Sequence, residues 1–208
     1  MLYGQDNMYY DIEIFNAMNS LANQSSATDM LIIFLADYVP YGVVLLLLSF
    51  LFLPRSGASI TQEAFTKLKK ERIKNRDMVL LAICSAIIPI LIVKNIILFF
   101  YQRLRPYIAL PLAHKLISVS TAENLQSFPS GHAMFFFAIA TVVYLYHKTW
   151  GIAFFIIAIL ISISRVIAGV HYLSDVIGGA IIGIGIAYLS AYLFNYLKIK
   201  LKNNIINN

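Results

Sequence analysis

The sequence has few of the residues on which soluble and secreted domains depend. Only 12% of its 208 residues are charged, and Cys84 is its single cysteine. A lone cysteine excludes an intramolecular disulfide. So little charge, beside 60% hydrophobic residues and a mean hydropathy of +0.75, excludes an ordinary soluble domain. The composition is that of a membrane protein.

Positive charge is also absent from a long part of the chain. No lysine or arginine precedes Arg55, whereas the segment 54–77 and the C-terminal tail are rich in both. The positive-inside rule places these two segments in the cytoplasm, and the short His147-Lys148 turn agrees. The net charge of +6 is therefore a topology signal, and the basic loop is available to anionic lipid. Because no basic patch is interleaved with exposed aromatics, nucleic acid is not an expected partner.

Long apolar stretches define the predicted architecture, since a bilayer core of about 30 Å takes roughly 20 helical residues. Five stretches are predicted to span, at residues 30–53, 78–101, 131–147, 151–168 and 175–197. Residues 8–22 are amphipathic and too polar to span, which predicts an interfacial helix. The predicted fold is an all-α polytopic membrane bundle, with residues 1–29 as an N-terminal interfacial segment and 30–208 as the membrane domain.

This topology places the N-terminus outside a plasma membrane and the C-terminus in the cytoplasm. It also puts the 102–130 and 165–174 loops on the same outer side, so their polar residues can form a joint site. The last predicted span carries a small-residue face suited to close helix packing, made of Gly178, Gly179, Gly183 and Gly185.

The first polar island is Pro129-Ser130-Gly131-His132. Pro129 suits the first turn of a helix, and the free backbone donors of the next residues form an anion site at a helix N-terminus. The Ser130 hydroxyl adds a donor, and Gly131 allows an oxyanion close to the backbone. The alternative is a serine cap followed by an interfacial histidine, both of which are common at helix starts.

The second island holds Arg165, His171 and Asp175. The histidine and the aspartate are four residues apart, so they share a helix face. A carboxylate on one ring nitrogen fixes the tautomer and leaves the other nitrogen free to attack. The guanidinium of Arg165 can bind two phosphate oxygens at once. The alternative is a His-Asp pair capping the last helix, with Arg165 reaching lipid headgroups.

Arg105 follows the second predicted span and completes a set suited to phosphoryl transfer. Two fixed guanidinium groups, Arg105 and Arg165, would neutralise charge on the transferred phosphoryl group. One histidine would attack phosphorus and the other would protonate the leaving oxygen. With one cysteine and no carboxylates grouped near the histidines, the sequence predicts neither a metal nor a cofactor.

In this order and on these helix ends, the residues resemble the type 2 phosphatidic acid phosphatase family of membrane lipid phosphatases. The second family motif matches Pro129-Ser130-Gly131-His132; the third matches Ser164, Arg165, Gly169, His171 and Asp175. The resemblance implies that His171 forms a phosphohistidine, with Asp175 as its orienting partner and His132 as the general acid. It also implies that four residues bind phosphate: Arg105, Ser130, Gly131 and Arg165. Metal independence is implied as well.

The first family motif departs from the pattern, because Leu98 stands seven residues before Arg105 where the family has lysine. Lys94 is one turn deeper on the same helix face, about 6 Å by helix rise, and its long stem spans part of that gap. Arg103 is the nearer rival, and His114 and Lys115 are weaker candidates. Lys94 or Arg103 is therefore predicted to bind substrate in place of the missing lysine.

The N-terminal pattern of Asn16, Asn19, Asp29 and Asp37 is similar to the bacitracin-resistance branch of the family. This resemblance implies hydrolysis of undecaprenyl pyrophosphate at an outward-facing site. The alternatives are a phosphatidylglycerophosphate or phosphatidic acid phosphatase, a lipid phosphotransferase, and a phosphate-binding membrane protein without catalysis. The expected partners are thus an isoprenoid or glycerophospholipid phosphate and membrane lipids, and the oligomeric state is not predicted.

Overall fold

A computed structural model describes residues 3–52 and 62–206, and every regular element in these residues is a helix. The last residue of the first predicted span and the start of the predicted basic segment, residues 53–61 with Arg55 among them, lie outside the described residues. In chain order the elements are α1 Tyr3–Asn19, α2 Ser26–Ile33, η1 Phe34–Tyr38, α3 Val39–Ser49, α4 Gln62–Ile88, η2 Pro89–Val93, α5 Lys94–Phe100, α6 Pro106–Ala109, η3 Thr121–Glu123, α7 Gly131–Tyr146, α8 Lys148–Ile167 and α9 Leu173–Ile206.

Consecutive elements join into four helical segments long and apolar enough to cross a membrane. These are Ser26–Ser49, Thr66–Phe100, Lys148–Ile167 and Leu173–Asn204. The third predicted span is the shorter helix α7, which packs against α4, α8 and α9 and is buried along most of its length. A helix that is apolar on all sides is stable in the centre of a bundle. The all-helical prediction is therefore confirmed, with four long candidate spans and one short one.

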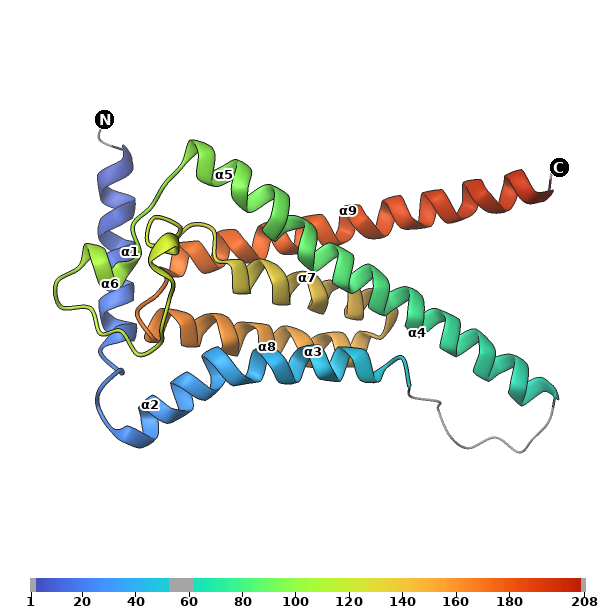
Figure 1. Ribbon diagram of the computed structural model, residues 1–208, viewed down its shortest axis with the longest axis horizontal. Coiled ribbons are helices and arrows are strands. Elements are labelled where there is room, and N and C mark those ends of the chain that lie inside the picture. The colour runs from blue at the N-terminus through green and yellow to red at the C-terminus, as the bar shows by residue number, and fades with distance from the viewer. Residues whose placement is uncertain (1–2, 53–61, 207–208) are drawn as a thin grey trace.

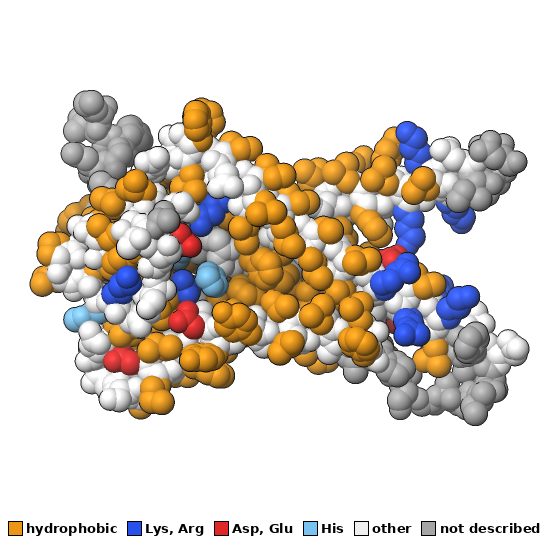
Figure 2. Space-filling model, in the orientation of Figure 1, with side chains coloured by type: hydrophobic (Ala, Val, Ile, Leu, Met, Phe, Trp, Pro, Cys, Tyr) orange, Lys and Arg blue, Asp and Glu red, His pale blue; other side chains and the backbone are white. Residues whose placement is uncertain are grey.

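Large apolar side chains cover the outside of the long helices. Leu45, Ile181 and Phe99, for example, are 68%, 66% and 82% exposed. Figure 2 shows that hydrophobic side chains cover the middle of one face, between two ends that carry more charged side chains. An exposed apolar surface of this extent belongs against lipid, and the chain is a multi-pass membrane protein.

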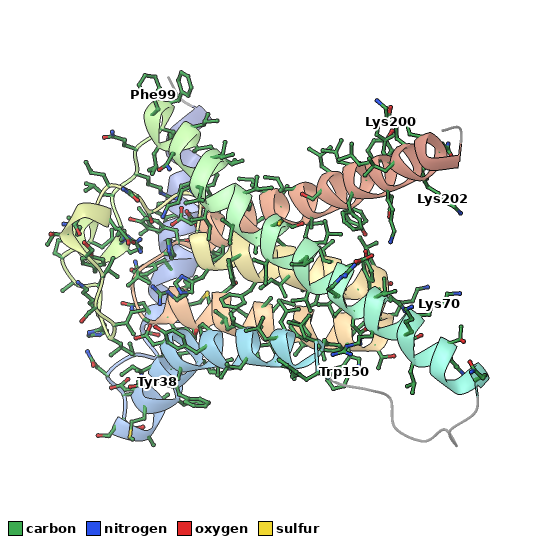
Figure 3. The ribbon with its side chains drawn as sticks, turned by 45° about the vertical axis from the view of Figure 1, so that its right-hand side comes forward. Tyr38, Lys70, Phe99, Trp150, Lys200 and Lys202 are labelled. Carbon is green, nitrogen blue, oxygen red and sulfur yellow. The ribbon has the colours of Figure 1, made fainter. Side chains whose placement is uncertain are left out.

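The two ends of the bundle differ in character. Helix α1 lies across one end, beside α6 and the loops that join α5 to α7 and α8 to α9 (Figure 1). The opposite end holds the α7–α8 turn and the C-terminal part of α9. Lys70, Lys200 and Lys202 gather at this second end (Figure 3). Both polar islands therefore lie at the loop end, away from the lysines.

Helix α1 begins five residues earlier than the predicted helix at 8–22 and ends three residues earlier. Its buried residues Asp11, Phe15 and Asn19 recur every four positions and form one stripe. Phe15 packs on Tyr172, and the Asn19 amide donates to the Ile167 and His114 carbonyl oxygens. This stripe holds α1 on the loop end; the interfacial location of α1 stays a prediction.

Close packing of α9 on α7 fixes the two polar islands relative to each other. A Cβ on Gly179 would lie 2.6 Å from the Ser130 carbonyl oxygen, and one on Gly183 would lie 2.3 Å from the Met134 carbonyl oxygen. Both positions therefore exclude any side chain, as the predicted small-residue face requires. Gly185 has no neighbour within 4 Å at that position, so its assignment to this face was wrong.

Candidate active site

A cavity of about 780 Å³ opens at the loop end, among η1, α3, α5, α7 and α8. One part of its wall is polar and carries six of the predicted site residues: Lys94, Arg105, Gly131, His132, Arg165 and His171. The other part is apolar and aromatic, with Ile33, Pro40, Val44, Ile90 and Phe135 among its residues. The cavity thus pairs a cationic region with a surface suited to a hydrocarbon chain.

His171 sits in the short loop between α8 and α9 and is 2% exposed. Gly169 makes the turn into this loop with φ at +85°, and a Cβ there would lie 1.9 Å from the His114 carbonyl oxygen. Only glycine combines this conformation with so close an approach. The motif glycine therefore sets the path of the chain from Arg165 to His171.

The two ring nitrogens of His171 have different neighbours. Nε2 lies 3.3 Å from an Arg105 Nη1, and Nδ1 lies 3.6 Å from the Asp175 Oδ2. A guanidinium can only donate, so Nε2 accepts and the ring proton belongs on Nδ1, facing the carboxylate. Burial lowers the pKa of His171 to about 4, and Arg105 adds to this against the opposing effect of Asp175. The ring is neutral near pH 7, with a lone pair at the cavity.

Arg105 is 2% exposed and every one of its donor nitrogens has a partner. Its Nε donates to the Glu123 carbonyl oxygen, its Nη1 to the Val170 carbonyl oxygen and its Nη2 to the Glu123 carboxylate, at 3.0, 3.1 and 2.8 Å. The Glu123 side chain is 45% exposed. This carboxylate can be displaced by an anionic ligand more readily than the backbone oxygens, which hold the guanidinium in place.

Arg165 projects from the last turn of α8 into the same cavity. Its Nη1 donates to the Asp37 carboxylate at 3.0 Å and to the Ala36 carbonyl oxygen at 3.4 Å. The buried Nε has no acceptor within the part of the chain that the structure describes. The guanidinium therefore keeps hydrogen-bonding capacity beyond its contact with the half-exposed Asp37.

Two π-helical turns bring polar residues to the cavity wall. The turn η1 carries Asp37 and Tyr38, and η2 directly precedes Lys94. Each π turn inserts one residue into the helical register, a feature common at functional sites. Because of η2, the Lys94 N–H bonds to the Pro89 carbonyl oxygen five residues back, and Lys94 lines the cavity. Its Nζ is 3.8 Å from where a Gly131 Cβ would be.

The Pro-Ser-Gly-His island begins α7, and its members lie at different depths. Gly131 and His132 line the cavity, and the His132 ring packs at a tilt on Phe136. Ser130 is fully buried below them and is not among the lining residues. Its Oγ accepts weakly from the Ala133 N–H at 3.5 Å, and its own N–H donates to the Asp175 carbonyl oxygen. The structure therefore gives Ser130 the position of a helix cap.

Arg103 does not reach the cavity, in contrast to the prediction that it binds substrate. Its guanidinium bonds to Asp11, Ser174 and Asp175, and its Cζ lies 3.9 Å above the Tyr172 ring. Its ion pairs explain this, because the Asp11 and Asp175 carboxylates hold the guanidinium at the start of α9, outside the cavity lining. Of the two predicted replacements for the family lysine, Lys94 alone faces the cavity.

Several residues near the site carried no sequence motif. Ser127 donates to the Asp175 Oδ2 at 2.6 Å, and Asp11 contacts the start of α9. Glu123 pairs with Arg105, and Asp37, which the N-terminal pattern does include, pairs with Arg165. Among the residues described, no group of three or more His, Cys, Asp or Glu side chains could hold a metal ion.

Several known proteins are similar to this chain in sequence. The family model described as the PAP2 superfamily matches residues 79–199. The bacitracin transport permease protein BcrC of Bacillus licheniformis is 31% identical over 174 residues, covering 84% of this chain and 75% of that protein. The undecaprenyl-diphosphatase BcrC of Bacillus subtilis is 27% identical over 177 residues, covering 85% and 80%.

A solved structure shows a similar fold. The crystal structure of Aquifex aeolicus LpxE matches with a TM-score of 0.62 at 25% identity, covering 87% of this chain and 94% of that one. The match therefore extends over most of the helix bundle.

Proposed function

Because the chain belongs to the PAP2 superfamily, we propose that it hydrolyses the diphosphate of an isoprenoid lipid, undecaprenyl pyrophosphate. The observation that carries this proposal is the position of His171. Its Nε2 faces a cavity that three cationic side chains and an apolar wall share. The cations suit a diphosphate, and the apolar wall suits the chain attached to it. The relative named undecaprenyl-diphosphatase supports the choice of lipid.

In the first step, the His171 Nε2 attacks the terminal phosphorus of the bound lipid. The nitrogen–phosphorus bond forms as the bond from phosphorus to the bridging oxygen breaks, and undecaprenyl phosphate leaves. His132 gives a proton to that oxygen as general acid. Arg105, Arg165 and Lys94 stabilise the charge on the transferred oxygens, and Gly131 leaves room for them beside Lys94.

In the second step, water attacks the phosphohistidine. The nitrogen–phosphorus bond breaks, inorganic phosphate leaves, and His132 accepts the proton lost by water, which restores the starting state. Asp175 stabilises the positive charge on the His171 ring through Nδ1 in both steps. Asp37 and Glu123 pair with the two arginines and give way to phosphate oxygens when the substrate binds.

The active site faces the outside of the cell in this proposal, and the C-terminus is cytoplasmic. The lysines at the far end support this orientation through the positive-inside rule. In this proposal residues 1–29 lie at the outer interface, apart from the start of the first span at Ser26, and 30–208 form the phosphatase domain. The orientation suits a lipid carrier whose diphosphate is exposed on the outer leaflet.

The test is phosphate release by the purified protein in detergent with a chelator present. Undecaprenyl or farnesyl pyrophosphate, phosphatidylglycerophosphate and phosphatidate are compared side by side for wild type and His171→Ala. We expect chelator-resistant turnover that favours the isoprenoid diphosphate and is lost in the variant. Preference for a glycerophospholipid monoester would contradict the assigned substrate and leave the histidine mechanism in place. Turnover retained in His171→Ala would contradict the mechanism.

A further inference from the structure

Arg103 is the centre of a bonded group that the mechanism above does not use. Its Nη1 donates to the Asp175 Oδ1 and to the Ser174 Oγ, each at 2.7 Å, and its Nη2 donates to the Asp11 Oδ2 at 2.6 Å. The side chain is 14% exposed, and its Cζ lies over the Tyr172 ring, 3.9 Å from the ring centroid. We call Asp11, Arg103, Ser174 and Asp175 the Arg103 bridge.

Asp11 brings the N-terminal helix into this bridge. Besides binding Arg103, its carboxylate accepts hydrogen bonds from the Ser174 N–H and hydroxyl at the start of α9. A carboxylate at the N-terminus of α9 also interacts favourably with the dipole of that helix. Phe15, one turn along α1, packs on Tyr172 and keeps Asp11 in place. Asp11 lies outside the residues matched by the family model, 79–199.

The bridge decides where the Asp175 carboxylate points. Its Oδ2 accepts from the Ser127 hydroxyl at 2.6 Å and from the Tyr172 N–H at 2.8 Å, and its Oδ1 accepts from Arg103. These three donors fix the carboxylate with Oδ2 3.6 Å from the His171 Nδ1. Without Arg103, Oδ1 would keep no donor among the described residues, and the carboxylate could turn away from the histidine.

The two carboxylates stabilise the charge on the Arg103 guanidinium. Burial opposes the charge on Arg103, yet the Asp175 and Asp11 carboxylates raise the pKa of its guanidinium above the usual value. A guanidinium can bind two carboxylates at once through its planar fork, whereas a lysine ammonium would reach one of them. The two acidic partners thus need an arginine at this position.

We propose that Arg103 and Asp11 are positioning residues that orient Asp175, and through it His171, so that helix α1 is a working part of the catalytic site. This inference rests on the proposed function. It assigns Arg103 a role other than substrate binding and gives the N-terminal segment a function. Neither residue touches the substrate in this account, so their loss should slow the chemical step and leave phosphate binding intact.

The experiment compares three single variants, Arg103→Gln, Arg103→Lys and Asp11→Asn, and the double variant Asp11→Asn/Arg103→Gln with wild type. Glu13→Gln is the matched control, because Glu13 is exposed on the same helix. We expect kcat to fall by roughly 10- to 100-fold in Arg103→Gln and about 5-fold in Asp11→Asn, with Arg103→Lys between them. The KM and the inhibition constant of inorganic phosphate should stay within about twofold of wild type.

The double variant Asp11→Asn/Arg103→Gln tests whether the two residues act through one route. If they do, it should be no slower than Arg103→Gln alone, and the losses should not multiply. Thermal unfolding in detergent identifies variants that have lost the fold, and Asp11→Asn provides the result if Arg103→Gln is among them.

Three results would overturn the proposal. These are losses of kcat that multiply in the double variant, a weaker inhibition by phosphate, or activities within twofold of wild type in both Arg103→Gln and Asp11→Asn. A wild-type protein that releases phosphate from none of the lipids would instead refute the proposed function.

Discussion

Cationic side chains line a cavity at each end of the helix bundle, and the two cavities are nearly equal in volume, about 780 and 730 Å³. At the loop end the arginines are almost fully buried, with Arg105 2% and Arg165 8% exposed, and each has a carboxylate partner. At the other end, Lys70, Lys74 and Lys198 line the cavity. The Lys198 side chain is 60% exposed, although it binds Asp77 at 2.7 Å.

The difference shows that positive charge alone does not make a phosphoryl-transfer site. Buried guanidinium groups held by backbone oxygens need no rearrangement when charge develops on a bound phosphate. Exposed lysines are screened by water and counter-ions and are free to move. The loop-end cavity also has two histidines in its wall, whereas the described lining of the lysine-end cavity has none. The lysines are therefore expected to orient the protein in the membrane.

The largest effect is expected from removing the nucleophile at the loop end. His171→Ala should lower turnover by at least about 1,000-fold, because the proposed mechanism makes the covalent intermediate on this side chain. Inorganic phosphate should still bind, since the arginines are intact. Phosphate release and protection from thermal unfolding by phosphate measure the two effects. A loss of less than tenfold would contradict the assigned role.

A change that keeps the charge and removes the planar fork sharpens the comparison with the lysine end. Arg165→Lys makes this cavity chemically more like the other one, and we expect kcat/KM to fall roughly 100-fold because bidentate binding of phosphate oxygens is lost. Steady-state kinetics on the isoprenoid diphosphate give the measurement. Activity close to wild type would mean that net charge is sufficient.

A matched pair of lysine substitutions compares the two ends directly. Lys94→Ala removes a cavity cation beside Gly131, and we expect kcat/KM to fall about tenfold. Lys198→Ala removes a lysine of the other cavity and should leave kcat/KM within about twofold. Equal losses in the two variants would remove the distinction between the two ends.

The smallest expected effect is on stability against pH. His171 has a pKa of about 4 in the folded protein against 6.5 as its ordinary value, so the unfolded state binds more protons between these pH values. Folding stability should therefore fall as the pH falls from 6.5 to 4. Thermal unfolding of wild type and His171→Gln across this window checks it, and the variant should lose less stability. Identical slopes would contradict the folded-state pKa.

Much of the site was predictable because its key residues lie close in sequence at helix ends. Pro129 to His132 lie at the start of one helix, and Arg165 to His171 run from the last turn of another into the loop that follows it, so apolar lengths alone place them at one end of the bundle. The family resemblance was confirmed by the match over residues 79–199. The catalytic and binding roles of these residues stay predictions.

Other parts of the site depend on long-range geometry that periodicity does not reveal. Lys94 was predicted from helix periodicity and lines the cavity, but the π turn that precedes it could not be predicted from that periodicity. Arg103 was predicted to bind substrate, but its ion pairs with Asp11 and Asp175, both distant in sequence, hold it outside the cavity lining. Asp11 carries no motif, and only the packing of α1 on the α8–α9 loop reveals its contact.

The most direct test of this account is to trap the covalent intermediate. Farnesyl pyrophosphate labelled on its terminal phosphate is mixed with the protein and quenched in alkaline detergent, where phosphohistidine survives, and the labelled peptide is identified. We predict label on His171 in the wild type and in Arg103→Gln, where it forms more slowly, and none in His171→Ala. Label on any other residue, or turnover that continues without labelling of His171, would contradict the central claim.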